Sequence, residues 1–473
     1  MPQGKETLHD IVHGPAIEMS FAFLADKLFD LKDSREIILL RHYGTWLLFY
    51  SSVIFFYLLC RLHFKNEILA LLGCLFLVLH PRIFANSFYN SVDIALLSFY
   101  TISMYTLIRY QKTKSLTMAT VHAFTCAILV DIRLIGVMMP FISYILFLGD
   151  LVENRQDRRK AWQTIRNAAV YTIALVSFGI LFWPYLWRDS FSGLMEIIRM
   201  TPRITMGVAN LYLGEYVNAM QLSWHYIPVW IGITTPILHI LFFIAGCLAI
   251  FRVLMKKTLW SSNRTKNYYL FIAAFSFPVL LVIIFNSTLY DSWRHLFFVY
   301  PAFVLIALTG VEGCFKLMAK YCHDKTHGAF KAVLTFSIAT SFVFTGTFMM
   351  RHHPYQNVYF NCLAGENMKE VKEKFDLDYW GLSYRQGLEH IAENDKSENI
   401  KVYDAVSFEP LANNIKILSF TDRRRISQVM SPDEAKYIIT NYRWHKQDYP
   451  YPNEFFSISI GNAKIMTVFN VKP

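Results

Sequence analysis

Long apolar runs recur through the first three quarters of this chain and are separated by short polar segments. About ten of these runs approach the roughly 20 mainly apolar residues that a membrane-spanning helix needs. They lie near residues 41–61, 66–83, 92–109, 116–131, 134–150, 168–186, 228–254, 268–285, 295–317 and 332–350. Only 17% of the residues are charged, against about 25% in an average soluble domain. The chain is therefore predicted to be an α-helical, multi-pass integral membrane protein.

The loops between these runs fall into two groups that differ in charge. Lysine and arginine are concentrated in loops 61–67, 109–114, 155–166, 252–266 and 316–331. Aromatic, amide and carboxylate side chains are concentrated in loops 80–93, 131–133, 188–228 and 286–294. Because basic loops stay in the cytoplasm, the second group is expected on the outer face of the membrane. The net charge of +11 then reflects loops beside a lipid bilayer and does not indicate a nucleic-acid partner.

Three parts are predicted along the chain. Residues 1–36 form an outer loop with an amphipathic interfacial helix at 17–31, and residues 37–350 form the transmembrane domain. Residues 351–473 contain no spanning run and are expected to fold as a small α/β domain outside the membrane. Its predicted elements are a helix at 384–394, strands at 400–406 and 437–441, and a hairpin at 455–460 and 464–470. The expected location is a bacterial inner membrane.

The polar stretch from His80 to Asp93 interrupts two apolar runs and holds candidate ligand groups at a fixed depth. Arg82 could bind an anionic group there, and Asp93 could position a substrate or a metal. An ordinary polar turn explains the same residues, with Asp93 as a helix N-cap. Both readings remain open on this stretch alone.

Two further clusters lie at the expected outer ends of spanning segments. Asp131 and Arg133 stand at a helix junction, where charged groups are functional candidates, although a mutually satisfied ion pair is the simpler explanation. Tyr290, Arg294 and His295 belong to the densest polar run and directly precede an apolar segment. Arg294 could bind an anion at that helix entrance. The alternative is an aromatic and arginine anchor at the membrane interface.

Four motifs in this order resemble those of the integral-membrane glycosyltransferases of the GT-C fold. The closest group comprises the protein O-mannosyltransferases and lipid A aminoarabinose transferases, in and around glycosyltransferase family 39. His13-Gly14-Pro15 resembles an HPP-type motif, and Asp93–Phe99 follows the pattern D-x-x-L-L-x-F. Arg133–Pro140 and Arg294–Pro301 resemble two later motifs, in which an arginine precedes a short run that ends in proline.

This resemblance implies transfer of a sugar from a polyprenyl-phosphate donor to a glycan, lipid or protein acceptor on the outer face. The catalytic carboxylates would be Asp93 and Asp10. The substrate-binding residues would be His13, Arg82, Asp131, Arg133, Tyr290, Arg294 and His295. No cofactor is required for certain, although a divalent metal ion is a candidate; the seven cysteines show no metal-ligand spacing.

The sequence departs from the family pattern at its start. Family enzymes carry a catalytic aspartate after a first spanning helix, and no such helix precedes the predicted outer loop 1–36. We therefore expect this chain to be impaired or inactive as a transferase. Two other functions remain open: a transporter or flippase of a lipid-linked or anionic substrate, and a non-catalytic scaffold whose outer domain binds a partner.

Overall fold

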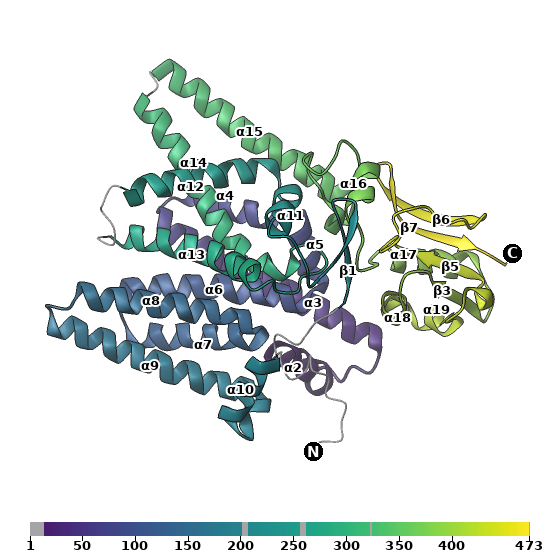
Figure 1. Cartoon of the computed structure of the whole chain (residues 1–473), viewed down its shortest axis with the longest axis horizontal. Helices are drawn as coiled ribbons and strands as arrows, with labels where there is room; N and C mark the ends of the chain where they lie inside the picture. Colours follow the sequence, from purple (N-terminus) through teal and green to yellow (C-terminus); the bar gives the residue numbers. More distant parts are fainter. Residues whose placement is uncertain (1–13, 201–206, 256–261, 322–323, 473) are drawn as a thin grey trace.

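The computed structural model describes residues 14–200, 207–255, 262–321 and 324–472. A bundle of long helices makes up most of the molecule, and a small α/β domain lies at one end of it (Figure 1). The bundle helices are α3 (Ser34–Phe64), α4 (Glu67–Val78), α5 (Pro81–Tyr89), α6 (Ser91–Thr113), α7 (Leu116–Ile132), α8 (Met138–Glu153), α9 (Arg158–Phe182), α11 (Tyr226–Thr234), α12 (Ile237–Met255), α13 (Asn263–Ile284), α14 (Tyr300–Tyr321) and α15 (Asp324–Arg351).

The prediction of a multi-pass helical protein is confirmed. Within the described ranges, eight helices are long and apolar enough to cross a membrane, and the bent pair α4–α5 makes a ninth if it counts as one span. Helix α7 corresponds to the expected segment 116–131 but has only 17 residues. Every apolar run singled out in the sequence therefore overlaps at least one helix.

Two expectations about these segments were wrong in detail. The run 228–254 is divided between α11 and α12, because Thr235 adopts an extended conformation before Pro236. The stretch 80–93 was expected to be a loop, but it forms α5, whose axis is bent by 69° from that of α4. Helix α5 starts with proline at its first turn, and the ring of His80 accepts a hydrogen bond from the backbone N–H of Ile83.

Short elements cover the end of the bundle that carries the α/β domain. They are α2 (Ala16–Phe23), a π-helical turn (Leu24–Leu28), α10 (Ser190–Met200), and the hairpin of β1 (Ala209–Tyr212) and β2 (Glu215–Asn218). The expected amphipathic helix at 17–31 is thus shorter than predicted. The chain leaves it near Asp30, which has a φ of 48°.

The C-terminal domain is a five-stranded sheet with the strand order β4-β3-β5-β7-β6. Its strands are β3 (Ile400–Asp404), β4 (Ile426–Gln428), β5 (Tyr437–Thr440), β6 (Glu454–Ile460) and β7 (Ala463–Asn470), and its helices are α16 (Met368–Lys374), α17 (Tyr384–Asn394), α18 (Phe408–Ile417) and α19 (Phe420–Arg425). The central strands β3 and β5 are parallel, and β6 and β7 form an antiparallel hairpin. The predicted elements of this domain are confirmed to within a few residues.

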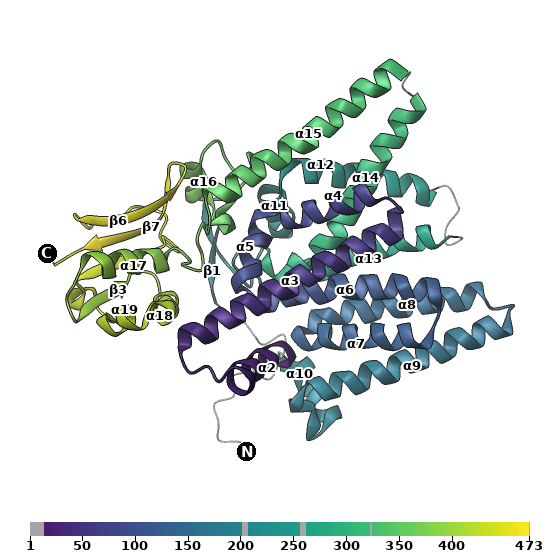
Figure 2. The ribbon, with the colours of Figure 1, turned by 180° about the vertical axis from the view of Figure 1, so that it is seen from behind.

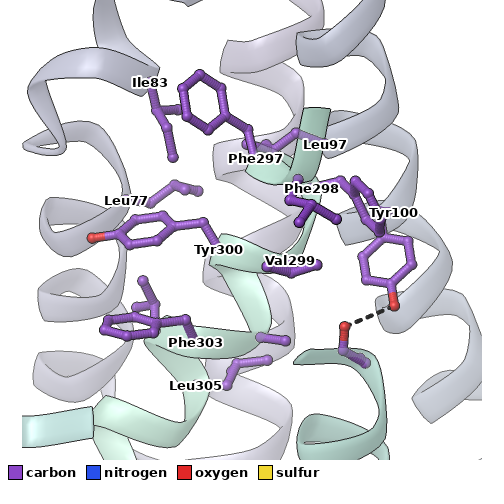
Figure 3. Packing of buried hydrophobic residues seen from close by; sticks show 14 of the residues in the cluster. Leu77, Ile83, Leu97, Tyr100, Phe297, Phe298, Val299, Tyr300, Phe303 and Leu305 are labelled. Carbon is purple, nitrogen blue, oxygen red and sulfur yellow. Dashed lines mark hydrogen bonds between the residues drawn. The ribbon is translucent and has the colours of Figure 1, made fainter. Parts of the chain in front are cut away.

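The 3₁₀ turn before α14 and the first half of α14 are buried, and their side chains pack closely with those of neighbouring helices (Figure 3). Phe297, Tyr300 and Phe303 are buried and lie among the side chains of neighbouring helices. Tyr100 of α6 is also fully buried, and its hydroxyl donates to the carbonyl of Ala274 in α13 at 2.9 Å. This packing holds the start of α14 beside the start of α6.

The two ends of the bundle differ, as the loop charges led us to expect. Helix α5, strand β1 and the C-terminal domain gather at one end, while the connection between α8 and α9 lies at the other (Figures 1 and 2). Helix α3 begins at the first end, where Ser34 Oγ donates to the carbonyl oxygen of Lys416 at 3.1 Å. Residues rich in carboxylate, amide and aromatic groups therefore share one end of the molecule.

Candidate functional site

Asp93 lies in the first turn of α6, where a second polar side chain fixes it. The side-chain oxygen of Asn90 accepts a hydrogen bond from the backbone N–H of Asp93 at 3.1 Å, which caps the helix. The amide group of Asn90 then donates to Asp93 Oδ2 at 2.8 Å. The carboxylate of Asp93 is buried, so its charge must be compensated by neighbouring groups.

Two arginines compensate that charge. Arg133, at the end of α7, places Nη2 2.9 Å from Asp93 Oδ1. Arg294, in the 3₁₀ turn before α14, places Nη1 2.8 Å from Asp93 Oδ2. The three residues meet through these contacts, although 40 and then 161 positions separate them in sequence. Their role in binding a substrate stays a prediction.

A second aspartate extends this cluster toward the C-terminal domain. Asp291 Oδ2 lies 3.2 Å from Arg294 Nη2, and its Oδ1 accepts from Arg443 Nη2 at 2.6 Å. The indole N–H of Trp380 also donates to Asp291 Oδ2, at 3.1 Å. Both Arg443 and Trp380 follow the last bundle helix, so the C-terminal domain supplies part of the cluster.

Aromatic rings enclose the guanidinium of Arg294. Its central carbon lies 4.8 Å from the centroid of the Tyr290 ring and 5.1 Å from that of Trp380. The Tyr290 ring in turn meets the imidazole of His295 edge to face, with 4.7 Å between centroids. Cation–π contacts of this kind strengthen in a desolvated site. The rings of Tyr290 and Trp380 therefore fix the orientation of the Arg294 guanidinium plane.

The backbone at Asp291 and Ser292 has an unusual conformation. Their φ angles are 60° and 67°, in the left-handed region that residues other than glycine rarely occupy. The side chain of Asn210, in β1, accepts a hydrogen bond from the backbone N–H of Asp291 at 3.2 Å. This backbone conformation directs the Asp291 carboxylate toward Arg294 and Arg443. The ion pairs that Asp291 makes with them offset the energetic cost of the conformation.

The chemistry of the cluster favours binding of an anion. It places the three arginines 133, 294 and 443 around two aspartates, which leaves one net positive charge. Guanidinium groups bind phosphate and carboxylate through paired N–H donors. Both oxygens of Asp93 face arginines, so proton transfer to this carboxylate would require an ion pair to open.

Asp131 makes contacts other than the ion pair with Arg133 that the sequence suggested. Its backbone carbonyl accepts from the N–H of Gly14 at 2.7 Å, and its Oδ1 accepts from the N–H of Ala16 at 2.9 Å. A methyl group at Gly14 would lie 2.1 Å from Asp131 Oδ2, so this contact requires glycine. Asp131 therefore fixes the start of α2 beside Arg133.

Arg82 lies in a neighbouring aromatic environment and not in the Asp93 cluster itself. Its Nε donates to the carbonyl of Tyr359 at 3.0 Å, and its guanidinium carbon lies 4.4 Å from the centroid of the Phe360 ring. Tyr379 links the two regions, because it interacts electrostatically with both Arg82 and Arg294. Burial raises the pKa of Tyr379, so its phenol stays protonated there.

Asp10 and His13 lie outside the described residues. A divalent metal ion was a candidate, with no ligand residues assigned to it. In the described ranges, no group of three or more histidine, cysteine, aspartate or glutamate side chains could hold a metal ion.

Sequence reasoning did not select three members of this region. Asp291 lies inside the polar run that was singled out, but Trp380 and Arg443 stand far from it in a part of the chain that looked like an ordinary soluble domain. Contacts between residues 152 positions apart, such as Arg443 with Asp291, leave no local pattern in the sequence.

A family model agrees with the predicted resemblance. Residues 17–189 match the family model described as dolichyl-phosphate-mannose-protein mannosyltransferase. This match confirms the resemblance to the GT-C glycosyltransferases over the region that carries Asp93 and Arg133. No curated protein matches the chain.

Among the solved structures to which the chain is similar are the following two. One is the archaeal oligosaccharyltransferase AglB from Archaeoglobus fulgidus, in complex with an inhibitory peptide and a dolichol-phosphate, with a TM-score of 0.49 and 10% identity. That match covers 91% of this chain and 61% of the other, so this chain spans about three fifths of its length. The other is ArnT from Cupriavidus metallidurans bound to undecaprenyl phosphate, with a TM-score of 0.45, 11% identity, and coverage of 97% and 88%.

Proposed function

We infer that this chain is a membrane glycosyltransferase with the GT-C fold, and we propose that it transfers a sugar from a polyprenyl-phosphate donor to an acceptor on the outer face. The acceptor would be a glycan, a lipid or a protein. The meeting of Arg133 and Arg294 on the carboxylate of Asp93 carries the proposal. It supplies, at one end of the bundle, the paired donors that a lipid phosphate needs.

In the proposed reaction an acceptor hydroxyl attacks the anomeric carbon of the donor sugar. The bond from that carbon to the phosphate oxygen breaks, and polyprenyl phosphate leaves with the bonding electrons. Negative charge grows on the leaving phosphate, so cations fixed beside it stabilise the transition state. Arg133 and Arg294 would take this role, and Asp93 would hold both guanidinium groups in place.

The proton of the acceptor hydroxyl must pass to a base. Asp93 and Asp10 are the two carboxylates that we propose for this step. Asp93 would have to release an arginine first, for instance when the donor phosphate draws that arginine away. A correctly placed base contributes about 10²–10⁴-fold to the rate.

An apolar groove near the end of α7 would suit the polyprenyl tail. It has a volume of about 400 Å³ and lies between α2 and the end of α9, with Ala16, Phe23, Phe182 and Trp187 in its walls. Ala16 is held by Asp131, two residues before Arg133. The groove therefore opens close to the end of α7, where the lipid phosphate would bind.

The test is transfer of sugar from a polyprenyl-phosphate donor by the purified chain and its variants. Arg294→Gln should lower the rate constant about 10²–10³-fold, as expected when one charge-stabilising donor is lost. Arg264→Gln is the matched control, because Arg264 pairs with Glu312 in a different part of the bundle. Unchanged transfer by Arg294→Gln would contradict the proposed role of the cluster.

Binding of the lipid should be measured separately from transfer. Arg133→Gln and Arg294→Gln should each weaken binding of the polyprenyl phosphate product, whereas Asp10→Asn should leave that binding unchanged and lower only the transfer rate. Transport of the donor lipid across vesicles without sugar transfer would instead support the flippase alternative.

A further inference from the structure

A hollow lies between the last turns of α3 and α6, away from the candidate site. It has a volume of about 340 Å³, and its walls include Arg61, Lys65, Arg109 and Lys112. Helix α3 starts beside the C-terminal domain and runs away from it (Figure 2). Its 31 residues cover about 46 Å at 1.5 Å per residue, so the hollow lies at the opposite end of the bundle.

The positive charge of this hollow is largely uncompensated. Arg61 pairs with Glu67 at 2.8 Å, and the same carboxylate also accepts from the hydroxyl of Tyr57. In the described part of the chain, Lys65, Arg109 and Lys112 make no ion pair with a carboxylate. Four cations and one carboxylate leave a local charge of about +3.

One of these cations has a structural role. Lys112 Nζ donates to the carbonyl of Leu62 at 3.0 Å, in the last turn of α3, and cations are favourable at the C-terminal end of a helix. Such capping accounts for Lys112 but not for the grouping of all four residues around one hollow. Lys65 and Arg109 are therefore the cations available to a ligand.

The part of the hollow nearer the middle of the two helices is lined by apolar side chains. Leu58 and Tyr105 line it one turn closer to the middle of α3 and α6. A ligand that fills it must present negative charge toward the helix ends and apolar surface toward the bundle interior. An anionic phospholipid at the membrane boundary has this arrangement, and basic pockets between spanning helices bind such headgroups.

We propose that this hollow is a binding site for the phosphate headgroup of an anionic phospholipid in the leaflet opposite the candidate active site. Lys65 and Arg109 bind the phosphate, Arg61 and Lys112 add to the field, and Leu58 with Tyr105 contact the first carbons of the acyl chains. The site does not depend on the proposed transferase activity.

Native mass spectrometry of the full chain in detergent tests this site, with cardiolipin as the anionic probe and phosphatidylcholine as the zwitterionic one. Wild type should retain cardiolipin and lose phosphatidylcholine under the same activation. The double variant Lys65→Gln/Arg109→Gln should bind cardiolipin about 25-fold more weakly, which is about fivefold for each cation.

The control variant is Arg158→Gln/Arg159→Gln, which removes two exposed cations from the start of α9, outside the hollow. It should bind cardiolipin as wild type does. An equal loss in both double variants would mean non-specific attraction and would overturn the proposal. Thermal unfolding of each variant tests whether a loss of cardiolipin binding results from a loss of folding.

Free phosphate is distinguished from lipid by competition. Inorganic phosphate at millimolar concentration should not displace cardiolipin, because it makes no contact with Leu58 or Tyr105. Displacement by phosphate alone would show that the hollow binds a soluble anion and would overturn the assignment to lipid. Retention of phosphatidylcholine by wild type, as firmly as cardiolipin, would also overturn it.

Discussion

Asp93 shows how a single buried carboxylate can organise distant parts of a chain. It is 1% exposed and meets one arginine through each oxygen. A buried ion cluster is not by itself a source of stability, because its members lose their hydration. Removing one member is nevertheless costly, since the remaining charges stay buried without a partner.

Replacing Asp93 with asparagine should therefore destabilise the protein by about 3–5 kcal/mol, because it leaves Arg133 and Arg294 facing each other. Thermal or chemical unfolding in detergent measures this loss. Adding Arg133→Gln to Asp93→Asn should recover part of it, since the repulsion between the two cations is removed. A double variant less stable than Asp93→Asn would contradict this account.

The buried Asp404 in the C-terminal domain should make the stability of the protein depend on pH. Burial raises the pKa of Asp404 from its ordinary value of 3.8 to about 6, although its Oδ1 accepts from the hydroxyl of Tyr384 at 2.7 Å. Because the folded-state pKa lies above the unfolded one, the contribution of Asp404 is fully present below about pH 4. It is lost as the pH rises through about 6.

Asp404→Asn should abolish this dependence, since the amide can still accept from Tyr384 and never ionises. Relative to the variant, wild type should lose about 2–3 kcal/mol of stability between about pH 4 and about pH 7. Unfolding curves of the full chain at several pH values measure the difference. Parallel pH profiles for the two proteins would show that Asp404 is not the group responsible.

At the scale of elements, close contact between α12 and α14 holds the centre of the bundle together. A methyl group on Gly246 would lie 1.9 Å from the carbonyl oxygen of Ile306, and one on Gly310 would lie 2.1 Å from that of Phe242. Small residues at such positions allow helix backbones in a membrane to approach closely. These two glycines therefore set the distance between the helices.

Gly310→Ala should destabilise the protein by about 1–3 kcal/mol, because the added methyl group has no space. Gly179→Ala is the matched control: it lies inside α9, and an added methyl group there would have no atom within 4 Å. The control should be neutral or more stable by about 0.5–1 kcal/mol, since alanine favours a helix over glycine. Equal effects in the two variants would rule out the packing explanation.

At the scale of the whole molecule, two ion pairs among the described residues are prominent in joining the C-terminal domain to the bundle. Arg443 binds Asp291 next to the candidate site, and Arg423 Nη1 donates to Asp33 Oδ1 at 3.0 Å, at the start of α3. The ion pair of Arg423 with Asp33 restrains rotation of the C-terminal domain about the ion pair of Arg443 with Asp291. Both contacts lie at the end of the bundle that holds Asp93.

This arrangement predicts which side of the membrane each end faces. Loops 155–166, 252–266 and 316–331 should be cytoplasmic and residues 351–473 outside, because lysine and arginine concentrate in the first group. A membrane-impermeant thiol reagent applied to intact cells should label the exposed Cys362. It should not label the variant Ser262→Cys at its new thiol. Cys362→Ser is the control for labelling, and a reaction at position 262 would reverse the topology.

The sequence alone determined the features that depend on neighbouring residues. Apolar runs located the helices, because the length of an apolar segment decides whether it can span a membrane. The β6–β7 hairpin was predicted from two strand-like runs around Gly461-Asn462, and Gly461 adopts a φ of 58° in the turn. Helix α17 was likewise predicted from a local pattern, the helical spacing of its apolar residues.

Which polar groups meet depends on the packing of the helices. The family resemblance named Asp93, Arg133 and Arg294, but their contacts depend on how α6, α7 and α14 pack. The link through Asp291 to Arg443 lay beyond local reasoning, because it joins two domains. Helix α5 was missed although His80 and Pro81 form a regular helix start, because its polar residues suggested a loop. The spacing of apolar residues within a segment indicates its secondary structure. Ion pairs between distant segments depend on how the helices and domains pack, and no single segment of the sequence determines that packing.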